Sequence, residues 1–191
     1  MPRGIADSWN AVGCCGIARA TNIDDVGFLR TLLTNVAARS DVDPARIMLA
    51  GHSNGGMMAY RTVCDPEIRV AAVANMAGSD VSGCATARPV RTLHIHGTAD
   101  QVVAYDGAVN LAETLLGADF PPAPTSMAAR AAAQGCPEPT DEVSGSVTIR
   151  RWTGCADGTE VEFVTIAGAS HDWQRPPIFD TTGAMLDFFG I

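Results

Sequence analysis

The stretch Gly51-His52-Ser53-Asn54-Gly55 decides the fold that we expect for this chain. It fits the pattern G-x-S-x-G and follows the short apolar run 46–50, which predicts a buried strand. The stretch 54–64 has no helix-breaking residue after Gly56 and predicts a helix. A serine at this position occupies a sharp turn between strand and helix, where small neighbours let its hydroxyl project above a sheet.

The alternation of strands and helices continues on both sides of this turn. We expect helices at residues 22–38, 54–64, 108–116, 127–134 and 182–189, strands at residues 46–50, 70–77, 92–96, 147–152 and 160–166, and a loop at residues 117–125. In the last helix Met185, Leu186 and Phe189 should point inward. This order predicts one α/β catalytic domain over residues 1–191, with a mostly parallel sheet covered by helices on both faces.

The composition excludes several classes of function. The chain has 191 residues, 47% of them hydrophobic, and a formal net charge of -8, so the basic patch of a nucleic-acid-binding protein is missing. All 13 basic residues are arginine, which excludes Schiff-base, pyridoxal phosphate and P-loop chemistry because each needs a lysine. We expect no membrane span, since no apolar run reaches about 18 residues, and we find no signal peptide in this sequence.

Six cysteines suggest an oxidising compartment. Their number is even and none lies in a zinc-binding pattern, which favours disulfides and a secreted or extracellular protein; buried free thiols are the alternative. Six cysteines allow 15 pairings, and the sequence supports only one specific pair. We expect Cys136 to bond with Cys155, because these residues flank a strand-like stretch within one polar region.

The chain offers one histidine in the right place to activate Ser53. A serine hydroxyl is a weak nucleophile until a base removes its proton, and α/β hydrolases carry serine, acid and histidine in that order. His171 follows every acid candidate and lies in a loop after a predicted strand. His94 and His96 share one face of a strand and are better explained as structural residues, whereas His52 lines the pocket or packs.

Asp100 is the preferred acid. It follows the predicted strand 92–96 by four residues, in His96-Gly97-Thr98-Ala99-Asp100. Asp80 trails the preceding strand and Asp106 lies farther from the strand end, so both are weaker candidates. We therefore expect Ser53, Asp100 and His171 to act together as nucleophile, acid and base.

Several segments together resemble the polyhydroxybutyrate depolymerase and feruloyl esterase-like family of α/β hydrolases. They are Ser8-Trp9-Asn10 with Cys14-Cys15-Gly16, residues 24–28, residues 51–61, residues 96–100 and His171-Asp172-Trp173. The resemblance implies an exported serine esterase that acts on polyesters, including synthetic ones such as poly(ethylene terephthalate), or on aromatic esters of the plant cell wall. It places the nucleophile, acid and base at the same three residues.

The resemblance also implies strands before Ser8-Trp9-Asn10 that this sequence does not contain. We expect a reduced sheet, with the backbone N–H of Asn54 as one oxyanion donor and the second donor supplied from elsewhere. The strand 46–50 should then be an apolar edge, covered by the N-terminal segment or by another copy in a homo-oligomer.

Trp9, Trp152 and Trp173 are candidates for an aromatic wall around the substrate, together with His52. We expect hydrolysis of an ester or polyester in a shallow open site, without a metal or organic cofactor and without a nucleic-acid or membrane partner. The alternative is a catalytically inactive, truncated hydrolase that binds a partner through its incomplete sheet. Amide hydrolysis would use the same residues and is not separable by sequence.

Overall fold

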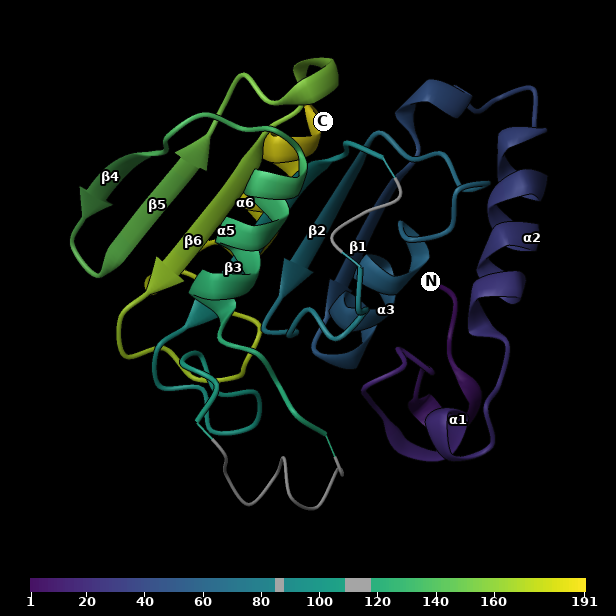
Figure 1. The fold of residues 1–191 in the computed structure, drawn as a ribbon, viewed down its shortest axis with the longest axis horizontal. Coiled ribbons are helices and arrows are strands. Elements are labelled where there is room, and N and C mark those ends of the chain that lie inside the picture. Colours follow the sequence, from purple (N-terminus) through teal and green to yellow (C-terminus); the bar gives the residue numbers. More distant parts are fainter. Residues whose placement is uncertain (85–87, 109–117) are drawn as a thin grey trace.

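The computed structural model describes residues 1–84, 88–108 and 118–191. Within them one six-stranded sheet runs through the molecule in the order β1-β2-β3-β6-β5-β4 (Figure 1). The strands are β1 (Met48–His52), β2 (Ala72–Met76), β3 (Arg91–Gly97), β4 (Thr140–Ser144), β5 (Val147–Trp152) and β6 (Val161–Ile166). The first four in this order are parallel, and β5 and β4 complete the sheet as an antiparallel hairpin.

Helices cover both faces of the sheet. The described helices are α1 (Gly16–Ala20), α2 (Asp25–Ala37), α3 (Asn54–Thr62), α5 (Ala123–Ala133) and α6 (Thr181–Phe189). One core contains Tyr60 of α3 and Met127 of α5, and another contains Met185 of α6 against the opposite face of β2 and β3. Figure 1 shows α5 in front of the sheet and α6 behind it. The predicted α/β class with two covered faces is therefore confirmed.

Some details of the fold differ from the sequence-based expectation. Helix α5 begins at Ala123 inside the expected loop, because a proline in the first helical turn costs no hydrogen bond. The hairpin strand β4 was not expected, and its five residues are exposed. In α6, Leu186 is exposed at 42% and Phe188 is buried in its place. Residues 109–116 of the expected helix 108–116 lie outside the described residues.

The N-terminal segment lies beside the edge strand β1. Met1, Pro2 and Trp9 line a cavity of about 250 Å³ together with residues 49–52. The strand is half-exposed along most of its length, so it forms the edge of the sheet among the described residues. The expected cover by the N-terminal segment is thus partly present, and cover by a second copy stays a prediction.

Three disulfides join cysteines in the described residues, at Cys14–Cys15, Cys64–Cys84 and Cys136–Cys155. The expected pair Cys136–Cys155 is therefore confirmed. It ties the end of the loop after α5 to the end of β5, beside the core. None of the helices in the described part of the chain has the length and apolar character needed to cross a bilayer.

Candidate active site

Ser53 occupies the tight turn between β1 and α3. Its φ of 53° and ψ of -126° lie in a region that side-chain-bearing residues rarely adopt. The turn requires a glycine at position 51, because a Cβ there would lie 2.3 Å from the backbone of Gly55. Gly55 itself is different: an added Cβ would meet nothing within 4 Å. The expectation that both motif glycines serve the turn is therefore correct only for the first.

The loops at the carboxyl ends of β3 and β6 bring two further side chains to Ser53. His171 Nε2 lies 2.9 Å from Ser53 Oγ, and His171 Nδ1 lies 2.8 Å from Asp100 Oδ2. Because β1, β3 and β6 are parallel, the turns that follow them lie together at the carboxyl ends of the strands. The three residues selected from the sequence thus form one continuous line of hydrogen bonds.

Asp100 is fully buried and is held as a carboxylate. Its Oδ1 accepts hydrogen bonds from the backbone N–H groups of Val102 and Val103, both at 2.8 Å. Burial alone would raise the pKa of Asp100, but hydrogen bonds from His171, His96 and the Val103 amide outweigh it and hold this pKa well below its usual value. The carboxylate is therefore ionised when it orients the imidazole of His171.

His52 packs against the back of His171. Its Nε2 lies 2.7 Å from the carbonyl oxygen of His171, and the edge of Trp173 meets its ring at 6.1 Å between centroids. Burial lowers the pKa of His52, so its neutral form donates to this carbonyl. His52 thus fixes the backbone of the loop that carries His171, and it also lines the cavity beside β1.

Asn54 links the turn to the N-terminal segment. Its side chain accepts from the Trp9 N–H at 2.7 Å and donates to the Trp9 carbonyl at 3.0 Å. The backbone N–H of Asn54 belongs to the first residue of α3 and therefore faces out of the helix N-terminus, where a negative charge is favoured. The Trp9 ring stacks on Phe28 and lines the same cavity as His52.

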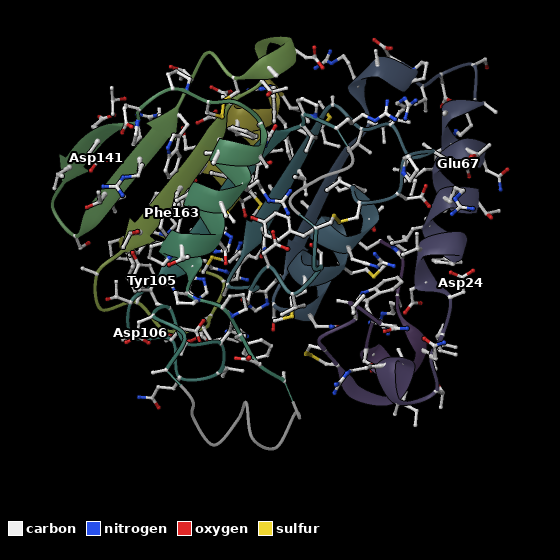
Figure 2. All side chains as sticks on the ribbon, in the orientation of Figure 1. Asp24, Glu67, Tyr105, Asp106, Asp141 and Phe163 are labelled. Carbon is white, nitrogen blue, oxygen red and sulfur yellow. A yellow bond between two sulfur atoms is a disulfide. The ribbon has the colours of Figure 1, made fainter. Side chains whose placement is uncertain are left out.

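The other candidates lie elsewhere. Trp152 is 6% exposed and pairs with Val161 at the opposite end of β6 from His171, so its expected place in a substrate wall is wrong. Asp80 forms an ion pair with Arg130. Asp106 is exposed and caps the backbone of Ala108; Figure 2 shows it in the loop beside Tyr105.

His96, which the sequence favours as a structural residue, is a neighbour of Asp100. His96 Nε2 lies 3.3 Å from Asp100 Oδ2, and its ring and that of His94 are fully buried. The alternation His94-Ile95-His96 predicts that the two imidazoles share one face of the strand, and the structure shows that they do. The spacing of residues along the strand does not predict that His96 contacts Asp100.

The chain is similar in sequence to fungal esterases. It is 32% identical to feruloyl esterase B of Piromyces equi over 174 residues, which are 87% of this chain and 31% of that protein. It is 29% identical to feruloyl esterase D of Neurospora crassa over 161 residues, 82% of this chain and 50% of that protein. The chain therefore spans at most half the length of these two relatives. No family model matches it.

Solved structures show the same fold. An acetyl xylan esterase from Aspergillus awamori superposes with a TM-score of 0.58 at 15% identity, covering 87% of this chain and 67% of the other. The esterase PE8 superposes with a TM-score of 0.51 at 22% identity, covering 84% of this chain and 58% of the other. At these identities the likeness concerns the fold alone.

Proposed function

We propose that residues 1–191, which are similar in sequence to feruloyl esterases and share the fold of solved esterases, form one catalytic domain that hydrolyses carboxylic esters through an acyl intermediate on Ser53. The observation that carries the proposal is the contact of His171 Nε2 with Ser53 Oγ at 2.9 Å, within reach of proton transfer. The imidazole is in turn held by Asp100 at 2.8 Å, as a base in such a site requires.

The proposed reaction has two halves. His171 Nε2 takes the proton of Ser53 as Oγ attacks the ester carbonyl, and the Asn54 N–H donates to the oxyanion that forms. The imidazolium then returns the proton to the leaving alcohol, which leaves an acyl-serine. The same imidazole deprotonates a water molecule that attacks the acyl group, and the imidazolium then returns this proton to Ser53 Oγ as the acid leaves.

Asp100 serves both halves without exchanging a proton. Its carboxylate keeps the proton of neutral His171 on Nδ1, so that Nε2 faces Ser53 as an acceptor. It also stabilises the imidazolium when this forms. Because its pKa is held well below the usual value, Asp100 can fill this role across the neutral and acidic range.

Esters of aromatic acids are the substrate class that we favour. The relatives named above are feruloyl esterases, and the cavity of about 250 Å³ beside the turn is lined by Trp9, His52 and Met58. Trp173, edge-on to His52, adds a second aromatic ring near the base. Aromatic and aliphatic polyesters contain the same type of carboxylic ester bond and belong to the same proposed range.

An oxidising compartment outside the cell is the proposed location. The disulfides Cys64–Cys84 and Cys136–Cys155 join residues far apart in sequence, and such bonds persist where thiols are not kept reduced. Esters of plant cell walls and polyesters are also extracellular materials.

The test compares hydrolysis of p-nitrophenyl acetate, methyl ferulate and a polyester film by the native chain and by its Ser53→Ala variant. We expect turnover by the native chain and a fall in kcat of about 10⁴-fold or more in the variant, because the nucleophile is lost. Ser144→Ala is the matched control, since Ser144 is exposed in the hairpin strand β4. Equal rates for Ser53→Ala and Ser144→Ala would contradict the proposal.

A further inference from the structure

Tyr60, His94 and His96 form a line of buried polar side chains that leads to Asp100 and has no role in the proposed reaction. Tyr60 Oη lies 2.8 Å from His94 Nδ1, and His94 Nε2 lies 3.0 Å from His96 Nδ1. His96 Nε2 lies 2.9 Å from the carbonyl oxygen of Val103 and 3.3 Å from Asp100 Oδ2. Tyr60, His94 and His96 are each 0% exposed, so each of these contacts is shielded from solvent.

The partners of His96 fix the direction of these hydrogen bonds. The Val103 carbonyl and the Asp100 carboxylate only accept, so His96 Nε2 carries the proton. A His96 ring with this single proton has its lone pair on Nδ1 and accepts there from the N–H at His94 Nε2. His94 in turn has its lone pair on Nδ1, which accepts from the hydroxyl of Tyr60.

The surroundings of His94 and Tyr60 keep the imidazole neutral and the hydroxyl protonated. Burial, followed by His96 and Arg130, lowers the pKa of His94 well below its ordinary value. Burial likewise raises the pKa of Tyr60 far above its ordinary value, so its hydroxyl keeps the proton that it donates. The guanidinium of Arg130 lies 4.2 Å from the centre of the Tyr60 ring and pairs with Asp80.

Aromatic packing holds the two imidazoles in place. The rings of His94 and His96 stack at 5.3 Å between centroids. Phe163 meets the His94 ring edge-on at 5.4 Å, and Tyr105 meets the His96 ring edge-on at 5.8 Å. Figure 2 labels Tyr105 and Phe163, which stack on each other at 5.9 Å. The line therefore has little freedom to turn away from Asp100.

We propose that Tyr60, His94 and His96 form a one-directional relay of hydrogen bonds that positions Asp100, with His96 as the positioning residue. His96 acts in two ways: its N–H lies against Asp100 Oδ2, and it holds the carbonyl of Val103, whose own N–H donates to Asp100 Oδ1. Both oxygens of the carboxylate thus depend on His96. The inference deepens the proposed function and rests on the roles of Ser53 and His171 given there.

The first test reads the protons directly. The chain has four histidines, so ¹⁵N labelling of histidine gives a spectrum that single variants can assign. We expect His94 and His96 to be neutral with the proton on Nε2. A proton on Nδ1 of His94, or a doubly protonated His96 at neutral pH, would reverse the relay and overturn the proposal. This test needs neither turnover nor a variant that folds poorly.

The second test uses the matched variants His96→Gln and His96→Leu. Glutamine keeps a donor and an acceptor at nearly the spacing of the two ring nitrogens, whereas leucine fills a similar volume with neither. We expect kcat of His96→Leu to fall about 10- to 100-fold per folded molecule, as for a lost hydrogen bond to a charged group, with KM within about twofold. His96→Gln should recover most of this loss.

The outcomes separate the two proposals. Equal kcat in the leucine and glutamine variants, or a loss that only follows the unfolded fraction measured by circular dichroism, would overturn the positioning role. Absence of turnover in the native chain would count against the proposed function, and the tautomers of His94 and His96 would still decide the relay.

Discussion

Ser53 combines an unfavourable backbone conformation with a reactive position. Its positive φ costs on the order of 1–3 kcal/mol, which the packing of β1 against α3 must offset. That packing requires the backbones of β1 and α3 to approach closely at Gly51, where a Cβ would lie 2.3 Å from the backbone of Gly55. The close approach at Gly51 thus keeps Ser53 in this conformation.

Glycine substitutions at the turn should therefore have opposite results. Gly51→Ala places a methyl group against backbone atoms that cannot move, so we expect lower stability and at least a 10-fold fall in kcat/KM. Gly55→Ala meets nothing within 4 Å and should fold with unchanged or slightly higher stability, because alanine favours a helix. Urea unfolding and ester hydrolysis by the two variants check this, and a less stable Gly55→Ala would contradict it.

The acid limb of the rate profile should report one group. Asp100 stays ionised because hydrogen bonds from His171, His96 and Val103 outweigh burial and hold its pKa well below the usual value. Activity then falls at low pH only because protonated His171 cannot accept the proton of Ser53. We expect log kcat/KM to decrease towards low pH with a slope no steeper than one, because Asp100 stays ionised and adds no second proton. A flat limb or a slope of two would be inconsistent with these roles.

The sequence predicted best which side chains the structure brings together. Ser53, Asp100 and His171 could be selected because each follows a recognisable strand and because their order along the chain is restricted. The sequence could not place Trp152 correctly. An aromatic residue in a strand indicates a packed face but does not indicate at which end of the sheet the residue lies. The contact of His96 with Asp100 depends on a loop conformation that no spacing rule describes.

At the scale of elements, the parallel strands were predictable and the hairpin was not. Strands β2 and β3 could be recognised because they are short segments rich in apolar residues, and nearly all their side chains are buried. Strand β4 has one apolar residue, Val143, and no alternation to detect. It pairs with β5, and ion pairs of Asp141 with Arg150 and of Glu142 with Arg151 join the two strands.

Strand β3 should make stability depend on pH through His94. Burial lowers its pKa well below the ordinary value of 6.5 in the folded chain, whereas the unfolded chain takes up the proton near that value. The unfolded state then binds more protons, so the free energy of unfolding decreases as pH falls below about 6.5, by up to about 1.4 kcal/mol per pH unit.

The variant His94→Gln isolates this contribution. We expect the loss of unfolding free energy between pH 7 and pH 5 to be smaller in the variant by up to about 2 kcal/mol, because the titrating group is gone. Urea unfolding at both pH values measures it. An equal loss in the native chain and the variant would mean that His94 is not held neutral.

At the scale of the whole molecule, disulfides tie the periphery to the core. Cys136 and Cys155 are 19 residues apart, and their bond joins the loop after α5 to the end of β5. At the β1 edge of the sheet, Met1, Pro2 and Trp9 line a cavity together with residues of the edge strand β1, and Figure 1 shows the N-terminus on this side of the molecule. The covalent link thus lies next to β5, and the N-terminal segment lies next to the edge strand β1.

Removing this disulfide should lower stability without altering the chemistry. For a loop of this length, chain entropy predicts a loss of about 3 kcal/mol in the double variant Cys136→Ser with Cys155→Ser. The kcat of the folded fraction should stay within about twofold, because neither residue approaches Ser53. Urea unfolding with and without a reductant checks the first statement. A double variant as stable as the native chain would refute it.

We propose that Ser53 is a nucleophile activated by His171 and Asp100. The most direct measurement is covalent labelling with a fluorophosphonate, followed by mass spectrometry of the intact chain and of its peptides. The account predicts one adduct per chain, on Ser53, and none in Ser53→Ala. It also predicts labelling of His171→Ala at least about 100-fold slower, because the base is missing. No adduct on the native chain, or the same adduct in Ser53→Ala, would contradict the account.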